Sequence, residues 1–573
     1  MQAQMIQKMQ TVQRTLDKNS DGIIGKEEIK MASATLATLD KDGNGILSRQ
    51  EMGDIGPMKG SIRNFGITRL VDTDGDLSAS AEEIKNAVTS ITRLDLNKDG
   101  KIDATELIYP RKSGQATPNF SMVARRELTL YPEKNEGPIL PGADERQAEG
   151  KLFIQYSNTG SDRQVNNRTL LFDEQGNITH KWTTNLHAPE GVSAYLLSNG
   201  NVMRTQSGGD WMHHSHYPVG ATGIVQIINP ASEVLWQFEY DEEGKHCLHH
   251  DQAMLPNGNI LLLAYEGFTQ AEASALGWKK PSEKFNYKYV WFEKILEVQP
   301  FFDKDSTAIV WEWSVSNHIV QDDDVKASNY GKISEHTDRI DVNYPFGGLF
   351  LKNQKFHFNS IDYNAEFDQI LLSSAMYGEH YIIDHSTTTE EAKTANGGKY
   401  GKGGRFLYRY GNKRATQTGE QTTFYWPHDA SWLPNEVPHK GDVLVFNNGS
   451  GRAPDGSYDP NQTPMPIGIA YTDILELKLP RKQDGSFDST KTPEIVWSYN
   501  SKNTEGVYAP FMSGARRLKN GNTIFCQGHN KRVVEITPEG EKVMDFQLAG
   551  PGNLFRVYKY ENEYSGIVAL SNR

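Results

Sequence analysis

A short turn motif recurs along most of this chain and narrows the folds open to it. An apolar residue, one spacer and Asn-Gly-Asn lead directly into a run of aliphatic residues. Asn-Gly is the strongest short-range signal for a β-hairpin, and a further strand rich in Trp or Phe follows each copy. Each unit is therefore expected to form a four-stranded antiparallel sheet. The copies lie at residues 197–201, 255–259 and 518–522, with a longer variant at 433–442.

Repetition of such sheets around an axis gives a β-propeller. Five units are clear, and a sixth can be assembled from pieces within residues 127–185. We therefore expect a mainly β protein with a six-bladed β-propeller over residues 120–573. A β-sandwich is the alternative, but it would not explain the repeated turn.

The first part of the chain, residues 1–112, has a different pattern, with short helices between acidic loops. Loops of 12 residues start at Asp17, Asp40 and Asp95, with oxygen-bearing side chains at positions 1, 3, 5 and 12 and Gly at position 6. This is the EF-hand pattern, whose oxygens suit calcium. The expected ligands are Asp17, Asn19, Asp21, Ile23 and Glu28 in the first loop, Asp40, Asp42, Asn44, Ile46 and Glu51 in the second, and Asp95, Asn97, Asp99, Lys101 and Glu106 in the last.

A further loop, the third in chain order, departs from this pattern. Its ligands would be Asp72, Asp74, Asp76 and Glu83, but Leu77 stands where Gly is expected. We expect three calcium sites, with this loop as a weaker fourth. The spacing leaves room for one shared helix between loops 1 and 2 and between loops 3 and 4, so we expect those loops to pair. No Met-rich groove stands out, which favours a structural role for calcium over a sensor role.

Composition limits the partners and the compartment. Lys+Arg 60 against Asp+Glu 73 gives a net charge of −13, which argues against nucleic-acid and polybasic membrane binding. No apolar run approaches the ~18 residues of a membrane-spanning helix. Residues 1–10 lack the apolar core of a signal peptide, so the sequence fits a cytoplasmic protein or a mature form. Cys247 and Cys526 are too few for a disulfide scaffold; one disulfide or two buried thiols both remain open. A linker is expected at residues 113–119.

Three of the repeats carry a histidine at the same register. His250 and His428 lie five residues before the Leu of their turn motif, and His357 lies five residues before Asp362 of a similar turn. Equivalent positions on the innermost strands of a propeller converge on its axis, so we expect the three histidines to meet there. They could bind a metal such as zinc, as in a metal-dependent hydrolase, or one could act as nucleophile or general base.

Residues next to these histidines are expected to support them. Asp251 and Asp429 directly follow His250 and His428 and could orient the rings. Asn359 follows His357 on the same side of its strand and offers a neutral donor. A separate cluster, His213, His214 and His216, is interpreted as a polar loop, with metal binding as the alternative.

These residues together resemble the bacterial arylsulfotransferases. The similar segments include His249-His250-Asp251, His357 through Asn364, residues 384–389 and 408–412, His428-Asp429-Ala430, residues 445–449 and residues 513–518. The resemblance covers about four fifths of the chain. It implies a six-bladed propeller that transfers a sulfuryl group from a phenolic sulfate ester to a phenol, without a nucleotide cofactor and through a sulfated histidine. Carried over by motif, His428 would be the nucleophile, and His250, His357 and Asn359 would bind the sulfuryl group and assist proton transfer.

One position departs from the family pattern. Ala375 stands where the family commonly places an Arg, and a guanidinium that binds sulfate bidentately is a large part of such a site. Arg405, Arg409, Arg516 or Arg517 could replace it from another strand, although surface or inter-strand roles are expected for them.

The alternative function is therefore a catalytically altered propeller that serves as a calcium-dependent binding or assembly module. Its EF-hand region would dock to a protein partner or a second copy of the chain. The resemblance and the calcium loops favour a periplasmic or secreted location.

Overall fold

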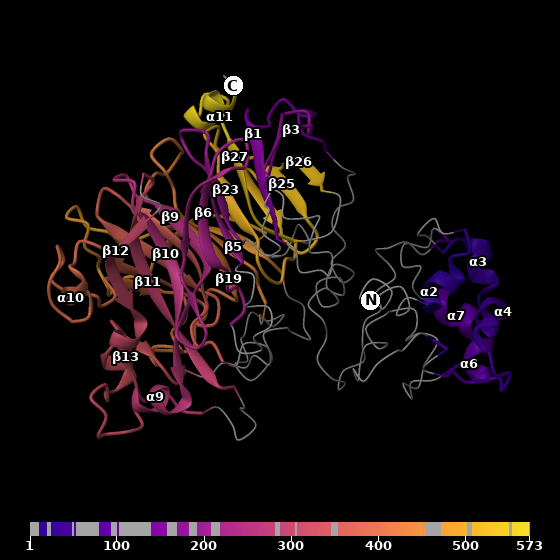
Figure 1. The fold of residues 1–573 in the computed structure, drawn as a ribbon, viewed down its shortest axis with the longest axis horizontal. Helices are drawn as coiled ribbons and strands as arrows, with labels where there is room; N and C mark the ends of the chain where they lie inside the picture. The colour runs from indigo at the N-terminus through magenta and orange to yellow at the C-terminus, as the bar shows by residue number, and fades with distance from the viewer. Residues whose placement is uncertain are drawn as a thin grey trace. The chain divides into compact units, whose positions relative to one another are not determined.

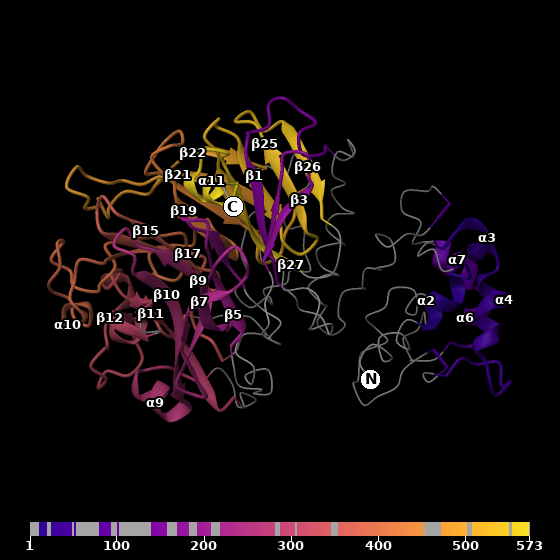
Figure 2. The ribbon, with the colours of Figure 1, turned by 45° about the horizontal axis from the view of Figure 1, so that its top comes forward.

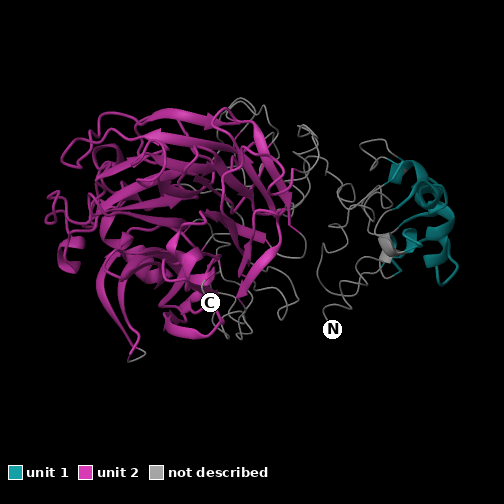
Figure 3. Cartoon of the chain, turned by 90° about the horizontal axis from the view of Figure 1, so that it is seen from above, with its two compact units in different colours: residues 1–132 teal, residues 133–573 magenta. Residues whose placement is uncertain are grey.

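The computed structural model describes residues 11–19, 24–48, 51–52, 79–92, 100–101, 139–157, 169–182, 192–207, 218–280, 287–303, 306–344, 353–450, 452, 471–500, 507–548 and 553–571. The chain forms two compact units, residues 1–132 and 133–573 (Figure 3). The expected linker at 113–119 lies outside the described residues, so the predicted domain boundary stays a prediction. None of the helices in the described part of the chain is long and apolar enough to cross a membrane.

The first unit is built from short helices. They are α2 (Thr11–Leu16), α3 (Lys26–Lys30), α4 (Ala32–Leu36), the 3-10 helix η1 (Ala37–Leu39), α6 (Ala81–Lys85) and α7 (Ala87–Thr92). A capping box starts α6, because the Ser80 side chain accepts from the Glu83 backbone N–H and the Glu83 carboxylate accepts in return. Buried aliphatic side chains, among them Leu16, Ile29 and Leu36, form the core of this unit.

The pairing of the calcium loops differs from the prediction. Leu47 of the second loop pairs with Ala79 of the third, through N–H···O bonds of 2.8 and 2.9 Å. The expected pairs, 1 with 2 and 3 with 4, are therefore wrong. Helical residues 26–39 join loops 1 and 2, and about 14 residues of helix span about 20 Å. A shared helix thus holds its two loops at opposite ends, where they cannot pair.

The second unit consists of six sheets arranged as the blades of a β-propeller, as the sequence predicts (Figures 1 and 2). The sheets, in hydrogen-bonded order, are β27-β1-β2-β3, β4-β5-β6-β7, β12-β11-β10-β9-β8, β15-β16-β17-β18, β19-β20-β21-β22 and β23-β24-β25-β26. A short parallel pair, β13 (Ile319–Val320) and β14 (Ile340–Asp341), lies outside the blades.

The strands of the blades have these bounds: β1 (Lys151–Ser157), β2 (Thr169–Phe172), β3 (Ile178–Trp182), β4 (Ala194–Leu196), β5 (Val202–Ser207), β6 (Gly223–Ile228), β7 (Val234–Glu239), β8 (Asp241–Glu242), β9 (His246–Met254), β10 (Ile260–Thr269), β11 (Tyr289–Phe301), β12 (Ser306–Ser314), β15 (Phe358–Asn364), β16 (Gln369–Ser374), β17 (Glu379–Asp384), β18 (Tyr408–Tyr410), β19 (Pro427–Trp432), β20 (Val443–Asn447), β21 (Asp473–Lys478), β22 (Glu494–Tyr499), β23 (Gly514–Arg517), β24 (Thr523–Gln527), β25 (Arg532–Ile536), β26 (Lys542–Gln547) and β27 (Asn553–Tyr560). Helices α9 (Gln270–Ala275), α10 (Thr389–Ala392) and α11 (Ser565–Ser571), with the 3-10 helices η4 (Val315–His318) and η5 (Ile333–Glu335), lie in the connections and at the C-terminal end.

The recurring motif forms the turn between the first two strands of a blade. In each Asn-Gly-Asn copy the backbone N–H of the Leu donates to the carbonyl of the last Asn at 2.8 Å, as between Leu255 and Asn259. The central Gly258 has a φ of +86°, a left-handed conformation that glycine adopts without strain. The turn fixes the register of the strands that follow it.

The first blade is closed by the last strand of the chain. β27 pairs antiparallel with β1, and the yellow β27 lies beside the purple β1 in both views (Figures 1 and 2). Hydrophobic clusters pack between neighbouring blades; one of them joins Leu152 of β1 to Ile524 of β24 and Leu554 of β27. This packing holds the innermost strands at fixed positions around the axis.

Candidate active site

The three predicted histidines lie at irregularities of three innermost strands. The pairing register shifts beside His250 in β9, beside His357 at the start of β15, and after His428 in β19. His250 and His357 have φ of 47° and 52°, and Asp429 has 56°. Bulges and left-handed non-glycine residues re-aim side chains and cluster at functional sites. The local backbone thus turns the imidazoles away from the regular sheet direction.

The rings come together near the axis and are all buried. The His250 and His357 ring centroids are 4.6 Å apart at an interplanar angle of 87°. The Phe555 ring lies 5.9 Å from His250 and 6.3 Å from His428. The convergence predicted from the repeat register is therefore present in the structure.

The backbone of Gly220 lies directly against the His250 ring. The His250 N–H donates to the Gly220 carbonyl at 3.1 Å. A Cβ at Gly220 would lie 2.0 Å from His250 Cε1. Only a glycine leaves room for the imidazole here.

His428 is held in one tautomer. Its Nδ1 lies 2.8 Å from Asn448 Oδ1 and 3.3 Å from the Trp426 carbonyl. Asn448 Nδ2 donates to the carbonyls of Ala509 and Met512, which settles the orientation of the amide. Both neighbours of Nδ1 are acceptors, so Nδ1 carries the hydrogen and Nε2 carries a lone pair.

A comparable arrangement anchors His357. Its Nδ1 lies 2.8 Å from Gln354 Oε1, and that oxygen also accepts from the Tyr265 hydroxyl at 2.7 Å. Tyr265 stacks on His249 with ring centroids 3.7 Å apart.

His250 ends a buried chain of titratable groups. Glu293 Oε2 lies 2.9 Å from His249 Nε2, and His249 Nδ1 lies 2.9 Å from His250 Nδ1. Glu293 Oε1 accepts from the Phe358 N–H at 2.9 Å. The His249 and Glu293 side chains are fully buried. The Glu293–His249 pair has the distance of a hydrogen bond without its alignment, so proton transfer along this chain needs a small reorientation of one side chain.

Burial sets the ionisation of this cluster. It lowers the pKa of His250 and His357 well below the usual value, with the neighbouring imidazoles adding to the effect. Burial lowers the pKa of His428 to about 4, against an opposing hydrogen bond to Asn448. Burial raises the pKa of Glu293. At neutral pH the three imidazoles are uncharged.

The aspartates that follow the histidines have another role than the predicted one. Asp251 Oδ1 and Asp429 Oδ1 each lie 2.7 Å from the guanidinium of Arg556 on β27. Asp429 is also paired with Arg516. Neither aspartate holds a histidine ring, because neighbouring side chains on a strand point in different directions. The Nδ1 partners are instead His249, Gln354 and Asn448.

Asn359 and Ala375 complete the predicted set. Asn359 Nδ2 donates to the Pro427 carbonyl at 2.7 Å and ties β15 to β19, while its buried Oδ1 has no partner among the described residues. The Ala375 N–H donates to the His357 carbonyl at 3.3 Å, and Ala375 packs in a hydrophobic cluster with Met376 and Tyr377.

Three of the four arginines that could replace the expected one have other partners, and the fourth, Arg405, has a buried Nη1 without a hydrogen-bond partner among the described residues. Arg409 is paired with Glu379, Arg517 with Glu476, and Arg516 with Asp429. Arg556 is the basic side chain that reaches the site, and its Nη2 donates to the Asn359 carbonyl at 3.2 Å. Its two carboxylate partners balance its charge.

A cavity of about 1160 Å³ opens beyond this ion-pair layer. Asp251, Asp429 and Arg556 line it together with aromatic side chains such as Tyr558 and Trp432. Its described lining includes none of the three histidines. The buried ions therefore separate the imidazole cluster from this cavity.

The described part of the calcium loops fits a calcium ion. Ligand oxygens of Asp40, Asp42 and Glu51 all lie within 4.8 Å of one another. Hydrogen bonds from Ser48 have the largest effect on the Glu51 carboxylate and, with one from the Lys41 backbone N–H, lower its pKa to about 2. This carboxylate is therefore ionised. In the first loop the Glu28 carboxylate accepts from Lys18 and Gly25 N–H groups. Several predicted calcium ligands lie outside the described residues: Asp21, Ile23, Asp72, Asp74, Asp76, Asp95, Asn97, Asp99 and Glu106. The predicted polar loop with His213, His214 and His216 also lies outside them.

Sequence reasoning missed the groups that anchor the imidazoles. Glu293 and Asn448 come from strands or turns distant in sequence, as does Arg556, which binds the neighbouring aspartates, whereas Gln354 lies only three residues before His357. His249 stands next to His250, so the pair of histidines was a usable signal. Cys247 and Cys526 are both free and buried, and burial raises the pKa of each thiol.

Comparisons with known proteins agree with these features. The arylsulfotransferase (ASST) family model matches residues 237–550, more than half of the chain, and an EF-hand family model matches residues 90–108. A search of curated proteins finds no match.

Solved structures similar to this chain include three examples. A protein of unknown function from Bacteroides caccae is 14% identical, over 72% of this chain and 98% of that one, with a TM-score of 0.37. The β-propeller domain of Cps50 (Swd1) from Myceliophteria thermophila is 7% identical, over 71% and 88%, with a TM-score of 0.33. Virginiamycin B lyase from Staphylococcus aureus is 9% identical, over 71% and 87%, with a TM-score of 0.30.

Proposed function

Because the chain belongs to the arylsulfotransferase (ASST) family, whose members are aryl-sulfate sulfotransferases, we propose that it transfers a sulfuryl group from a phenolic sulfate ester to a phenol. The observation that carries the proposal is the fixed tautomer of His428. A buried, neutral imidazole with its hydrogen on Nδ1 carries its lone pair on Nε2. Such an imidazole is a competent nucleophile toward sulfur.

In the first half-reaction His428 Nε2 attacks the sulfur of the ester. A nitrogen–sulfur bond forms, the sulfur–phenolate oxygen bond breaks, and the sulfuryl group is held on His428. His357 binds the anionic ester and takes up a proton with it, because a bound anion favours an imidazolium. Asn359 fixes the position of His428 through the Pro427 carbonyl.

The leaving phenolate takes its proton from His250 Nε2. His250 then accepts a proton at Nδ1 from His249, and His249 accepts one from the Glu293 carboxyl. The negative charge of the phenolate thus ends on Glu293, which the Phe358 N–H stabilises. In the second half-reaction the acceptor phenol gives its proton back along the same chain and attacks the sulfuryl group. Charge and protons balance over the cycle, and no nucleotide cofactor is required.

The test is release of 4-nitrophenol from 4-nitrophenyl sulfate with phenol as acceptor. Turnover is expected from the wild-type protein and from a His318→Ala control, since His318 is buried and bonded to the Ala392 carbonyl outside the site. His428→Ala should abolish turnover and the sulfated-protein adduct seen by mass spectrometry. Turnover by a folded His428→Ala variant would overturn the assignment of the nucleophile.

We further propose that the first unit binds three calcium ions that stabilise it, and that the protein acts in a calcium-rich extracytoplasmic compartment. The clustered Asp40, Asp42 and Glu51 carboxylates support the calcium proposal. Glu51→Gln should lower the calcium stoichiometry by one in equilibrium dialysis. An unchanged stoichiometry would contradict the assignment of that loop.

Ala375 favours a second candidate function, a propeller with altered catalysis that binds a protein partner or a second copy in the presence of calcium. At Ala375 the chain lacks the cation that its family commonly uses. If the calcium-loaded protein transfers no sulfuryl group from several aryl sulfates, this function is favoured. Calcium-dependent association in analytical ultracentrifugation would then be its direct sign.

A further inference from the structure

Buried glutamates recur at one register of the blades. Glu297 on β11 pairs with the second residue after Asn259, and Glu535 on β25 pairs with the second residue after Asn522. In both blades the turn amide satisfies one oxygen: Asn259 Nδ2 donates to Glu297 Oε1 at 2.6 Å, and Asn522 Nδ2 donates to Glu535 Oε1 at 2.7 Å. The last Asn of the turn therefore stabilises a buried glutamate of the neighbouring strands.

The second oxygen of each glutamate meets a basic side chain from another strand or loop. His385 Nε2 lies 3.1 Å from Glu297 Oε2, and Lys559 Nζ lies 2.9 Å from Glu535 Oε2. In these two blades a single carboxylate thus has the turn amide on one oxygen and a basic partner on the other.

The blade β19–β22 breaks this arrangement at the same register. Glu476 on β21 pairs with Leu444, the second residue after Asp442, and Arg517 lies 2.5 Å from Glu476 Oε2. Asp442 stands in the place of the Asn, and the Leu433 N–H donates to its carbonyl as in the other turns. An ionised Asp has no hydrogen to donate, so a second carboxylate faces the fully buried Glu476.

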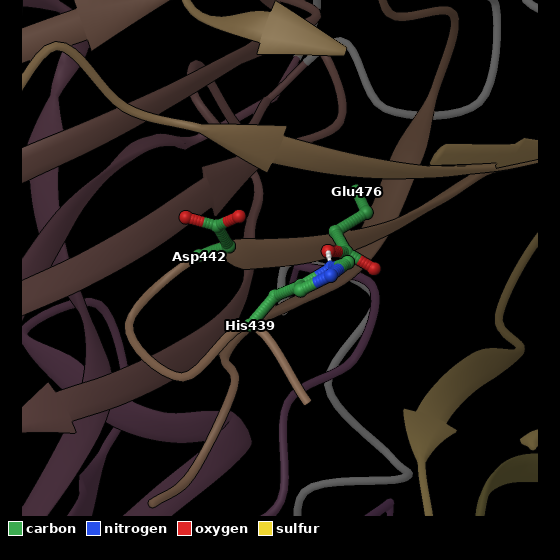
Figure 4. A group of neighbouring side chains, drawn as sticks. All are labelled: His439, Asp442 and Glu476. Carbon is green, nitrogen blue, oxygen red and sulfur yellow. Dashed lines mark hydrogen bonds and ion pairs between the residues drawn. The ribbon is translucent and has the colours of Figure 1, made fainter. Parts of the chain in front are cut away.

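A longer turn brings a histidine to these two carboxylates. Asp442 follows Leu433 by nine residues, where the other turns span four, and the insertion carries His439. His439 Nδ1 lies 2.5 Å from Glu476 Oε1, the oxygen that an amide satisfies in the other blades. Figure 4 shows the three side chains, with the His439 ring against the Glu476 carboxylate. Ligand atoms of all three residues lie within 4.8 Å of one another.

We propose that His439, Asp442 and Glu476 form a binding site for a divalent transition metal of the zinc class. The blade has replaced one neutral donor by a carboxylate and an imidazole together, and this pair of changes supplies two new metal ligands. One imidazole and two carboxylates suit zinc or cobalt, whereas calcium prefers oxygen ligands alone. The His439 side chain is 62% exposed, so an ion can enter from solvent.

The charge balance also fits a dication. Arg517 is ion-paired with Glu476, and the carboxylates of Asp442 and Glu476, held this close together, repel each other. A bound metal would relieve this repulsion. The site stands apart from the proposed sulfuryl transfer and does not depend on it.

The test is a cobalt titration of the full chain in excess calcium, which keeps the EF-hand loops filled. The wild-type protein should bind one equivalent with visible Co²⁺ absorption that Zn²⁺ displaces, and Zn²⁺ should raise its melting temperature. Asp442→Asn restores the residue that two other blades carry at this register, so the variant is expected to fold. It should lose that equivalent and the zinc-dependent shift.

His439→Ala should give the same loss, while a His246→Ala control should behave as wild type, because His246 stacks on Tyr240 in another blade. The proposal is overturned if the wild-type protein shows no such equivalent. It is also overturned if Asp442→Asn binds cobalt with the stoichiometry and spectrum of the wild type.

Discussion

The proposed proton relay Glu293–His249–His250 predicts that a change at Glu293 slows some substrates more than others, depending on the leaving group of the ester. In Glu293→Gln the amide N–H can donate to His249 Nε2 over the same 2.9 Å, so the geometry of the chain is preserved. The amide cannot give up a proton, however, and the charge of a departing phenolate can no longer end on residue 293. Glutamine has nearly the same size and shape as glutamate, so the melting temperature should change little.

The expected magnitude follows from the proton that the relay supplies. A positioned general acid contributes about 10²–10⁴-fold, which corresponds to about 3–5 kcal/mol in the barrier. An unsubstituted phenol has a pKa near that of tyrosine, about 10, and needs this proton to leave. The 4-nitrophenolate ion is much more stable and needs little help. Glu293→Gln should therefore slow phenyl sulfate by about 10²–10⁴-fold and leave 4-nitrophenyl sulfate nearly unchanged.

The assay is the first half-reaction in single turnover, followed for a series of aryl sulfates whose phenols differ in pKa. The slope of log rate against leaving-group pKa should become steeper in Glu293→Gln and in His249→Gln. Glu297→Gln is the matched control, because Glu297 lies on the same strand and bonds to Asn259 and His385. An equal loss on all esters, or none on any, would refute the relay.

Three further predictions concern the histidines and their supports. Protonation of His428, whose pKa burial lowers to about 4, removes the nucleophile, so kcat/KM should fall as pH drops below about 4; a fall centred near pH 6.5 would contradict this. Gly220→Ala should reduce activity and lower the free energy of unfolding by roughly 1–3 kcal/mol, because its Cβ would lie 2.0 Å from the His250 ring. Gly258→Ala is the control in urea denaturation, because Gly258 has a φ similar to that of Gly220 but open space around the added Cβ. Equal losses of stability in both variants would show that backbone strain acts alone, without the clash against His250. Arg556→Gln leaves the buried Asp251 without its ion-pair partner and Asp429 with Arg516 alone, and should cost about 3–5 kcal/mol in the same assay, whereas a loss below 1 kcal/mol would contradict the ion-pair layer.

The propeller could be predicted because its signal is local. Each Asn-Gly-Asn turn closes through a bond between residues four apart, such as Leu255 and Asn259, so the sequence carries the hairpin and its repetition gives the blades. The family resemblance is confirmed by the match over residues 237–550. The pairing of the calcium loops was predicted wrongly, because neighbours along the chain are held apart by the helix they share.

Of the candidate site, the three histidines could be predicted from the sequence, but the groups that hold them could not. The common register of His250, His357 and His428 is visible in the sequence, whereas their anchors Gln354 and Asn448 follow no repeat. Asp251 and Asp429 were expected to orient imidazoles, but a strand from the far end of the chain brings Arg556 between them. Such pairings are a property of the closed ring and have no local signature.

Because β27 closes the ring, it also sets the order in which the parts of the propeller can fold. The innermost strand of the first blade follows every other strand in the chain, and it carries both Phe555 and Arg556. During synthesis the five other sheets can form while Asp251 and Asp429 still lack this counter-ion and the imidazoles lack their aromatic neighbour. The histidine cluster therefore acquires its final surroundings in the same event that seals the propeller, so a nascent chain cannot complete this cluster before its fold is complete.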